Sequence, residues 1–239
     1  MSYYLQKEDD GPLKIWEHPY PHIQYCMGID TSTGLSQDYT SMQVFTRTYP
    51  YKQSAHFRAK LPVIDAGEMA NMLGRYYNEA LVVCEINYPG NAVQDALIQT
   101  YFYPKNYRAE EHLDSDPSVS AKYGFQTTQA KKWLIIRETQ ELMVEGGVEI
   151  SCEQTIEEMG NFVYIEDNTK TGGAPGFNDD TVIALMLALH GCMTYPQAIR
   201  KPKVKRETDP DKAQAQLMMK EFMNKLKARG TGREEPQVA

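Results

Sequence analysis

Four carboxylates stand at the ends of apolar segments, where a charge is costly to bury. Asp30 ends the run IQYCMGID, Glu85 lies in ALVVCEIN, and Asp179 and Asp180 open a long apolar stretch. A buried carboxylate is unfavourable unless it is paired or ligates a metal, and the stretches GID, CEIN and NDDT contain no Lys or Arg. Oxygen-only ligation suits Mg²⁺ or Mn²⁺. Two such ions roughly 3.5–4 Å apart activate a water and stabilise the entering and leaving oxygens of a phosphoryl displacement.

Each acid also has a plainer interpretation. Asp30 could cap the Ser/Thr/Gly turn that comes after it, and Asp179 with Asp180 could serve as an N-cap and a charge that compensates the helix dipole. Glu85 is harder to explain structurally, because Glu is a poor strand residue and this one interrupts a β-branched run. Taken together, the four acids favour a metal site more than any one of them does alone.

Alternating strands and helices are expected to position these acids. Period-2 alternation predicts a strand over 23–30 and a hairpin formed by YTSMQVFTRTY and SAHFRAKLPV. Helical spacing of apolar residues predicts a helix over 66–80, followed by a buried strand over 80–87 and a helix capped by Asn91. The apolar residues of the helix over 66–80 are expected to be core: Met69, Met72, Leu73, Tyr76 and Tyr77.

The second half of the chain is predicted with the same rules. A polar, Pro-broken loop with a possible short strand near 101–107 leads to a helix over 128–145 that ends at two glycines. A short strand, a brief helix and another strand come next, and TKTGGAPG is expected to be a flexible loop. Asn178 or Asp179 then caps a helix that is apolar almost all round, and a last helix is expected over 210–228. This order predicts an α/β three-layer fold with a central mixed sheet flanked by helices.

Composition limits the class of protein. Hydrophobic residues make up 41% of the chain, and no apolar run reaches the roughly 18 residues of a membrane helix, so we expect no membrane partner. The start of the chain has early acids and no apolar core, unlike a secretory signal. Four widely spaced cysteines indicate a reducing compartment, with the thiols acting as small hydrophobic groups.

Charge is distributed unevenly. Residues 200–239 hold 11 Lys/Arg against 6 Asp/Glu, a net of +5, which leaves −12 on 1–199 out of the total of −7. We therefore expect an extended lead-in over 1–22, one domain over 23–200, and a basic C-terminal tail over 201–239 that is partly helical or disordered. An acidic body argues against nucleic acid, unless clustered carboxylates hold cations that reverse the local field.

The acidic motifs carry a resemblance to a known family. The segments YCMGIDTSTGLSQDYTSMQVF, VVCEINYPGNAVQDAL, YGFQTTQAKKWLI and GFNDDTVIALMLAL, in this order, resemble the nuclease domain of the large terminase subunit of tailed bacteriophages. The resemblance runs over about 13–193 and implies the RNase H-like fold. It implies catalytic, metal-binding roles for Asp30, Glu85, Asp179 and Asp180. Asp38 matches an Asp-Tyr-Ser/Thr element whose aspartate assists metal binding or anchors the hairpin.

The resemblance also implies a function. It implies an endonuclease, dependent on two Mg²⁺ or Mn²⁺ ions, that cuts concatemeric double-stranded viral DNA during packaging in the host cytoplasm. The implied partners are the ATPase motor domain, the portal protein and the small terminase subunit. The ATPase motif G-x-x-x-x-G-K-[ST] does not occur in this chain, so no ATP hydrolysis is expected. Basic residues that could hold DNA phosphates are Lys105, Arg108, Lys122, Lys131, Lys132 and Lys170.

Three alternatives stay open at this point. GIDTSTG resembles the phosphate-binding hairpin of sugar kinases and actin-like ATPases, which nucleotide binding would reveal. A Holliday-junction resolvase or a transposase-like nuclease would use the same metal core on a different DNA. A non-catalytic packaging docking module would use the acids only to hold structure, and it would be indifferent to metal.

Overall fold

The computed structural model describes residues 11–34, 39–108, 123–165 and 170–197, together with positions 218 and 221. Asp38, Lys122 and nearly all of the expected tail helix over 210–228 lie outside the described residues. The four acids at the ends of apolar segments all lie within them.

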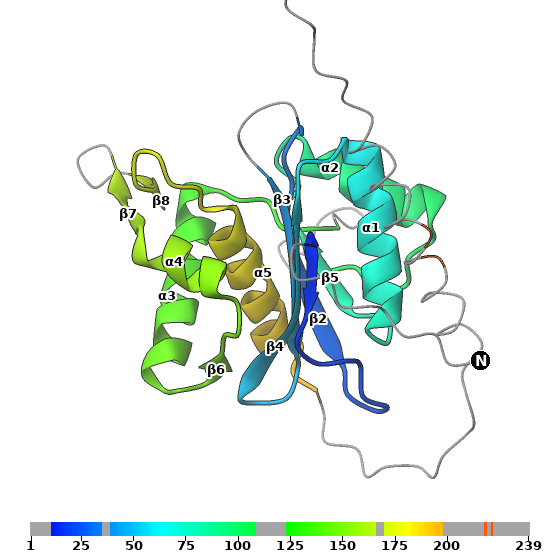
Figure 1. Cartoon of the computed structure of the whole chain (residues 1–239), viewed down its shortest axis with the longest axis horizontal. Coiled ribbons are helices and arrows are strands. Elements are labelled where there is room, and N and C mark those ends of the chain that lie inside the picture. The colour runs from blue at the N-terminus through cyan, green and yellow to red at the C-terminus, as the bar shows by residue number, and fades with distance from the viewer. Residues whose placement is uncertain are drawn as a thin grey trace, which may run out of the picture.

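A six-stranded mixed sheet forms the centre of the domain (Figure 1). Its order is β1-β4-β3-β2-β5, and β6 pairs with β4. β2, β3 and β4 are antiparallel neighbours, whereas β5 runs parallel to β2 and β6 runs parallel to β4. The strands are β1 Leu13–Ile15, β2 Tyr25–Asp30, β3 Thr40–Thr46, β4 Tyr51–Ala59, β5 Leu81–Cys84 and β6 Val148–Glu149.

Helices cover both faces of the sheet (Figure 1). One face carries α1 Val63–Tyr76 and α2 Gly90–Asp95, which continues as a π-helical turn over Ala96–Thr100. The other carries α3 Gln129–Val144, α4 Glu153–Gly160 and α5 Asp180–Thr194. A separate two-stranded sheet is formed by β7 Phe162–Ile165 and β8 Lys170–Gly173. The three-layer α/β prediction is confirmed.

Strand alternation divides the core into two clusters. Met27 and Ile29 of β2 pack with the residues of α1, whereas Cys26 of the same strand packs with the residues of α5. β5 behaves in the same way, since Val82 lies in the α1 cluster and Val83 in the α5 cluster. Alternate side chains along β2 and along β5 therefore lie on opposite faces of the sheet.

Most of the expected elements are present, with shifted ends. The hairpin is β3–β4, and the helix over 128–145 is α3, whose N-cap Thr128 accepts a hydrogen bond from the Lys131 amide. α1 starts and ends earlier than the predicted 66–80, because Pro62 fits the position before the first turn and Asn78 adopts a left-handed φ of 59° that ends the helix. All five apolar residues that this helix was expected to bury are buried.

Three local predictions were wrong. Asn91 is not a cap, since α2 begins at Gly90 with Pro89 at the cap position. Part of TKTGGAPG is strand β8, which pairs with β7 from Phe162↔Gly173 to Ile165↔Lys170. The sheet also begins within the segment expected to be a lead-in, because β1 pairs with β4. Very short or glycine-rich strands such as β1 and β8 gain their stability from the partner strand. Their own sequence does not have the pattern that predicts a strand.

All four cysteines are free and buried, as expected for thiols that serve as small hydrophobic groups. Among the described residues, no helix has the length and apolarity needed to cross a membrane.

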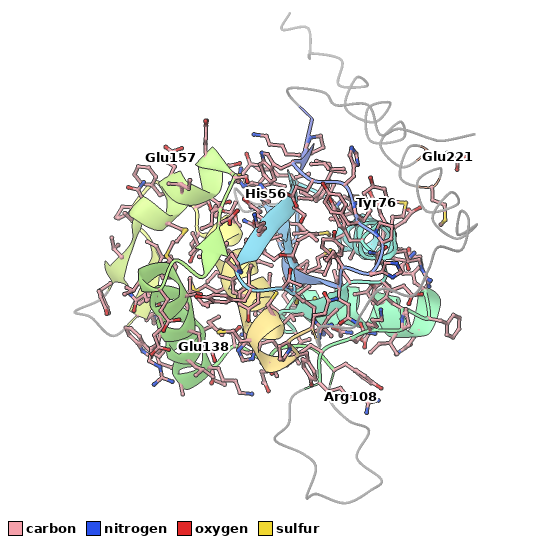
Figure 2. The ribbon with its side chains drawn as sticks, turned by 90° about the horizontal axis from the view of Figure 1, so that it is seen from below. His56, Tyr76, Arg108, Glu138, Glu157 and Glu221 are labelled. Atoms are coloured by element: carbon pink, nitrogen blue, oxygen red, sulfur yellow. The ribbon has the colours of Figure 1, made fainter. Side chains whose placement is uncertain are left out.

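His56 on β4 makes stability depend on pH. It lies in the interior of the domain (Figure 2), between the Ser41 hydroxyl at 3.2 Å and the Cys152 thiol at 3.3 Å. Burial, then the charges of Arg58 and Lys14, lowers the pKa of His56 to about 3. The folded state resists protonation, so its stability is complete above the ordinary His pKa of about 6.5 and falls as the pH drops from there toward 3.

We expect wild-type protein to lose about 1–2 kcal/mol of unfolding free energy between neutral pH and pH about 5 through this residue. Urea unfolding across this range measures the loss. His56→Gln should flatten the pH dependence, while the same change at exposed His22 should leave it as in the wild type. An unchanged slope in His56→Gln would show that the imidazole is protonated without cost.

Candidate metal centre

Asp30 and Glu85 are neighbours because β2 and β5 are parallel and in register. Ile29 pairs with Cys84, so the next residue of each strand reaches the same edge of the sheet. The Glu85 amide donates to the Ile29 carbonyl at 3.0 Å, and the Glu85 carboxyl is close enough to raise the pKa of Asp30. Parallel pairing thus juxtaposes two acids that lie far apart in the sequence.

α5 brings the second pair of acids to this edge. A Cβ placed on Gly28 would lie 2.0 Å from the Ala184 carbonyl oxygen and 2.4 Å from the Ala188 amide nitrogen, so the helix backbone rests directly on the strand. Asp180, Ala184 and Ala188 are four residues apart and share one helix face. Since Gly28 and Asp30 lie on the same side of β2, the start of α5 comes to lie beside Asp30.

One oxygen of Asp180 is held by groups from two other elements. Its Oδ2 accepts a hydrogen bond from the Tyr39 amide at 3.2 Å, and the Arg58 guanidinium lies 3.6 Å away. Arg58 is fixed in turn, because it contacts Glu158 Oε1 at 3.4 Å and lies 3.6 Å above the centre of the Tyr39 ring. These contacts orient the carboxylate, and they concern only Oδ2.

Glu158 joins α4 to the first turn of α5. Its Oε2 accepts from the Thr181 amide at 3.0 Å and from the Thr181 hydroxyl at 2.6 Å. Hydrogen bonds to a charged acceptor are stronger than those between neutral groups. Glu158 therefore fixes both the helix start that carries Asp180 and the arginine that contacts it.

Asp179 has a different neighbour. Its Oδ2 lies 3.9 Å from the Lys132 ammonium of α3, which also donates to the Thr171 carbonyl at 2.8 Å. Adjacent residues at a helix start cannot point the same way, and here Asp180 faces Arg58 whereas Asp179 faces Lys132.

The four acids act on one another electrostatically. Burial, then the charges of Glu85 and Asp180, raises the pKa of Asp30 well above its usual range, and Asp179 adds to the effect. Burial also raises the pKa of Asp180 to about 7, against the lowering effects of the Tyr39 amide and Arg58. A cluster that resists ionisation in this way would be stabilised by a nearby cation.

The donor set fits a hard divalent cation. All four side chains offer carboxylate oxygens only, which are the ligands that Mg²⁺ and Mn²⁺ prefer. Arg58 and Lys132 lie beside Asp180 and Asp179, whereas each group named as acting on the pKa of Asp30 raises it, so a cation beside Asp30 would be favourable. In the described part of the chain, however, no three His, Cys, Asp or Glu side chains are grouped so that they could hold a metal ion as they stand. The contact of Arg58 with Asp180 already compensates part of the charge of that carboxylate.

The basic residues divide into two groups. Lys105 contacts Glu79 at 3.8 Å, and its own carbonyl accepts from the Val82 amide near the start of β5, the opposite end from Glu85. Arg108 projects from the edge of the molecule (Figure 2), and its carbonyl accepts from the Tyr195 hydroxyl at the far end of α5. The structure therefore places these two away from the acids.

The other basic candidates lie around the start of α3. Lys131 lies 5.9 Å from the centre of the Phe125 ring, and Phe125 forms a bridge with Glu85. Lys132 is next to Asp179, and Lys170 begins β8. These three remain candidates for contacts with a phosphate backbone.

Arg58, Glu158 and Tyr39 were not found from the sequence. Arg58 reads as an ordinary outward residue of the strand YKQSAHFRA, and Glu158 lies in the acidic helix EQTIEEMG. The only hint in the sequence was that Asp180 would need a compensating positive charge if it were buried. This need does not identify the residue that supplies the charge.

The arrangement of the sheet and its flanking helices is that of an RNase H-like fold. Solved structures with this arrangement include the large terminase nuclease from thermophilic phage G20c with bound magnesium. This chain matches it with a TM-score of 0.63 and 20% identity, over 77% of this chain and 89% of that chain. The cobalt-bound form of the same nuclease matches with a TM-score of 0.62 and 21% identity, over 77% and 89%.

A third match is the large terminase nuclease domain of Thermus phage P74-26, with a TM-score of 0.60 and 18% identity over 78% of this chain and 89% of that chain. No family model and no curated protein sequence matches this chain. At these identities the likeness establishes a shared fold, which confirms the resemblance found in the sequence motifs at the level of the fold.

Proposed function

We propose that this chain is a divalent-metal-dependent endonuclease that cuts double-stranded viral DNA during genome packaging. The observation that carries the proposal is the convergence of Asp30, Glu85, Asp179 and Asp180 at one edge of the sheet, where Asp30 is surrounded by like charges. The fold is that of terminase nucleases whose structures contain magnesium or cobalt.

In this proposal, Asp30, Glu85 and Asp180 would hold Mg²⁺ or Mn²⁺, two ions in all, with Asp179 completing the set. Bound divalent ions supply a nucleophilic water and stabilise the charge on the departing oxygen. Tyr39 and Arg58 keep Oδ2 of Asp180 occupied, so its other oxygen is the one offered to a cation. Lys132 holds Asp179 in place beside it. Asp38, which lies outside the described residues, would assist in metal binding.

The proposed setting is the one that the resemblance of the sequence motifs to large terminases implies. Acting in the host cytoplasm, the domain would receive duplex DNA from the ATPase motor domain of the same terminase, working with the portal protein and the small terminase subunit. The basic residues of the tail would contribute to docking on such partners.

Plasmid degradation with Mn²⁺, Mg²⁺, Ca²⁺ or chelator tests the function. We expect cleavage with Mn²⁺ and Mg²⁺, none with chelator, and a higher melting temperature when Mn²⁺ is added, because binding to the folded state alone stabilises it. A preference for branched over linear duplex would instead indicate a resolvase-like nuclease. No cleavage and no thermal shift with any metal would favour a docking module and refute the proposal.

A further inference from the structure

A pocket of about 210 Å³ lies between the start of α3 and the β7–β8 sheet. It is lined by Thr127, Thr128, Gln129, Lys132, Trp133, Lys170 and Thr171. The lining has two ammonium groups, several hydroxyls and no carboxylate, although the protein carries a net charge of −7. A cavity with this lining is suited to an anion.

The walls of the pocket are held by contacts between the two elements. The Lys132 ammonium donates to the Thr171 carbonyl at 2.8 Å, and the Trp133 ring stacks on Tyr164 with centroids 5.4 Å apart. α3 and the β7–β8 sheet are therefore joined by two contacts at the pocket.

A second feature of the pocket indicates a hydrogen-bonding ligand. In the described part of the chain, the buried Oγ1 of Thr127 has no hydrogen-bond partner. A buried hydroxyl without a partner is unfavourable, and a phosphate oxygen is an acceptor to which it could donate a hydrogen bond. The pocket also lies at the amino end of a 16-residue helix, whose dipole favours a negative charge.

The pocket is adjacent to the candidate metal centre. Lys132 belongs to its wall, and the ammonium of the same residue lies 3.9 Å from Asp179. We infer that this pocket binds a phosphate of the DNA backbone close to the phosphodiester that is cut, and so sets the position of the strand over the acids. The inference rests on the proposed function, which it deepens by naming a contact of the substrate.

Binding without metal tests the inference separately from cleavage. A short fluorescent duplex is titrated with the full chain in chelator at several salt concentrations, with wild type, Lys170→Gln and Lys132→Gln. Each variant should bind roughly tenfold more weakly and should lower the slope of log affinity against log salt by about 0.9, the value for one lost phosphate contact. Lys52→Gln is the matched control. Lys52 pairs with Glu149 near the start of β4, at the opposite end of the sheet from Asp30, and both slope and affinity should be unchanged.

Inorganic phosphate and a mononucleotide serve as competitors. If the pocket holds a backbone phosphate, either should displace DNA from the wild type at lower concentration than from Lys170→Gln. Wild-type salt slopes in both lysine variants would overturn the inference, whether or not free phosphate binds. That result would not affect the proposal of metal-dependent plasmid cleavage. If instead the salt slopes fell as expected but the wild type did not cleave plasmid, only the proposed nuclease function would be rejected.

Discussion

Asp30→Asn should abolish DNA cleavage while making the metal-free protein more stable. The substitution removes one ligand from the proposed centre. Several kcal/mol of transition-state stabilisation depend on correctly bound ions, which corresponds to a loss of roughly a thousandfold or more in rate. It also removes a partly buried acid whose pKa is raised by burial and by the charges of Glu85 and Asp180. Relief of this repulsion should stabilise the metal-free state by about 1 kcal/mol.

Plasmid cleavage with Mn²⁺ and thermal unfolding with and without chelator measure the two effects. The wild type should gain stability with Mn²⁺, and Asp30→Asn should not. Asp95→Asn, an exposed change of the same type on α2, should match the wild type in every measurement. Cleavage by Asp30→Asn at the wild-type rate would remove Asp30 from the centre. Loss of both cleavage and stability would instead assign it a structural role.

Gly28→Ala should produce the largest loss of stability. The added methyl group would meet the backbone of α5 at Ala184 and Ala188, and backbone atoms cannot move aside by a change of rotamer. The helix must shift from the sheet, which costs about 3 kcal/mol or more when a packed core is overfilled. Because the same helix carries Asp180, stabilisation by Mn²⁺ and cleavage should fall together with the urea midpoint.

Gly160→Ala provides the matched control. A Cβ at this position meets nothing within 4 Å, so its urea midpoint and its response to Mn²⁺ should stay close to wild type. If Gly28→Ala kept the wild-type midpoint and metal response, the close contact between α5 and β2 would not be what positions the acids.

The position of the acids could be predicted to the extent that it depends on strand periodicity. Alternation places Gly28 and Asp30 on one face of β2, and it places Val83 of β5 and Glu85, the residue after this strand, on the corresponding face. The apolar character of α5 likewise identified it as a helix packed on all sides. The local sequence pattern was enough to predict the direction of a side chain wherever that direction depends only on the strand or helix that carries it.

Tertiary contacts were not predictable in this way. Arg58 and Glu158 contact Asp180 and its helix from elements far away in the sequence. The sequence around either residue does not predict these contacts. β8 forms because β7 offers hydrogen bonds to it, although its sequence KTGG favours a loop. The start of α1 was misplaced because Pro62 sets the boundary, whereas the apolar spacing begins further along.

The order of the elements along the chain means that the four acids cannot come together until α5 has been synthesised. Asp30 ends β2 and Glu85 follows β5, both in the first half of the chain, while α5 comes after every strand of the central sheet. Until that helix docks on Gly28, an emerging or partly unravelled copy carries only half of the acids, and Asp180 lacks its arginine. In the proposed nuclease, such a copy would not cut DNA, because cleavage would require α5 to be docked on the sheet.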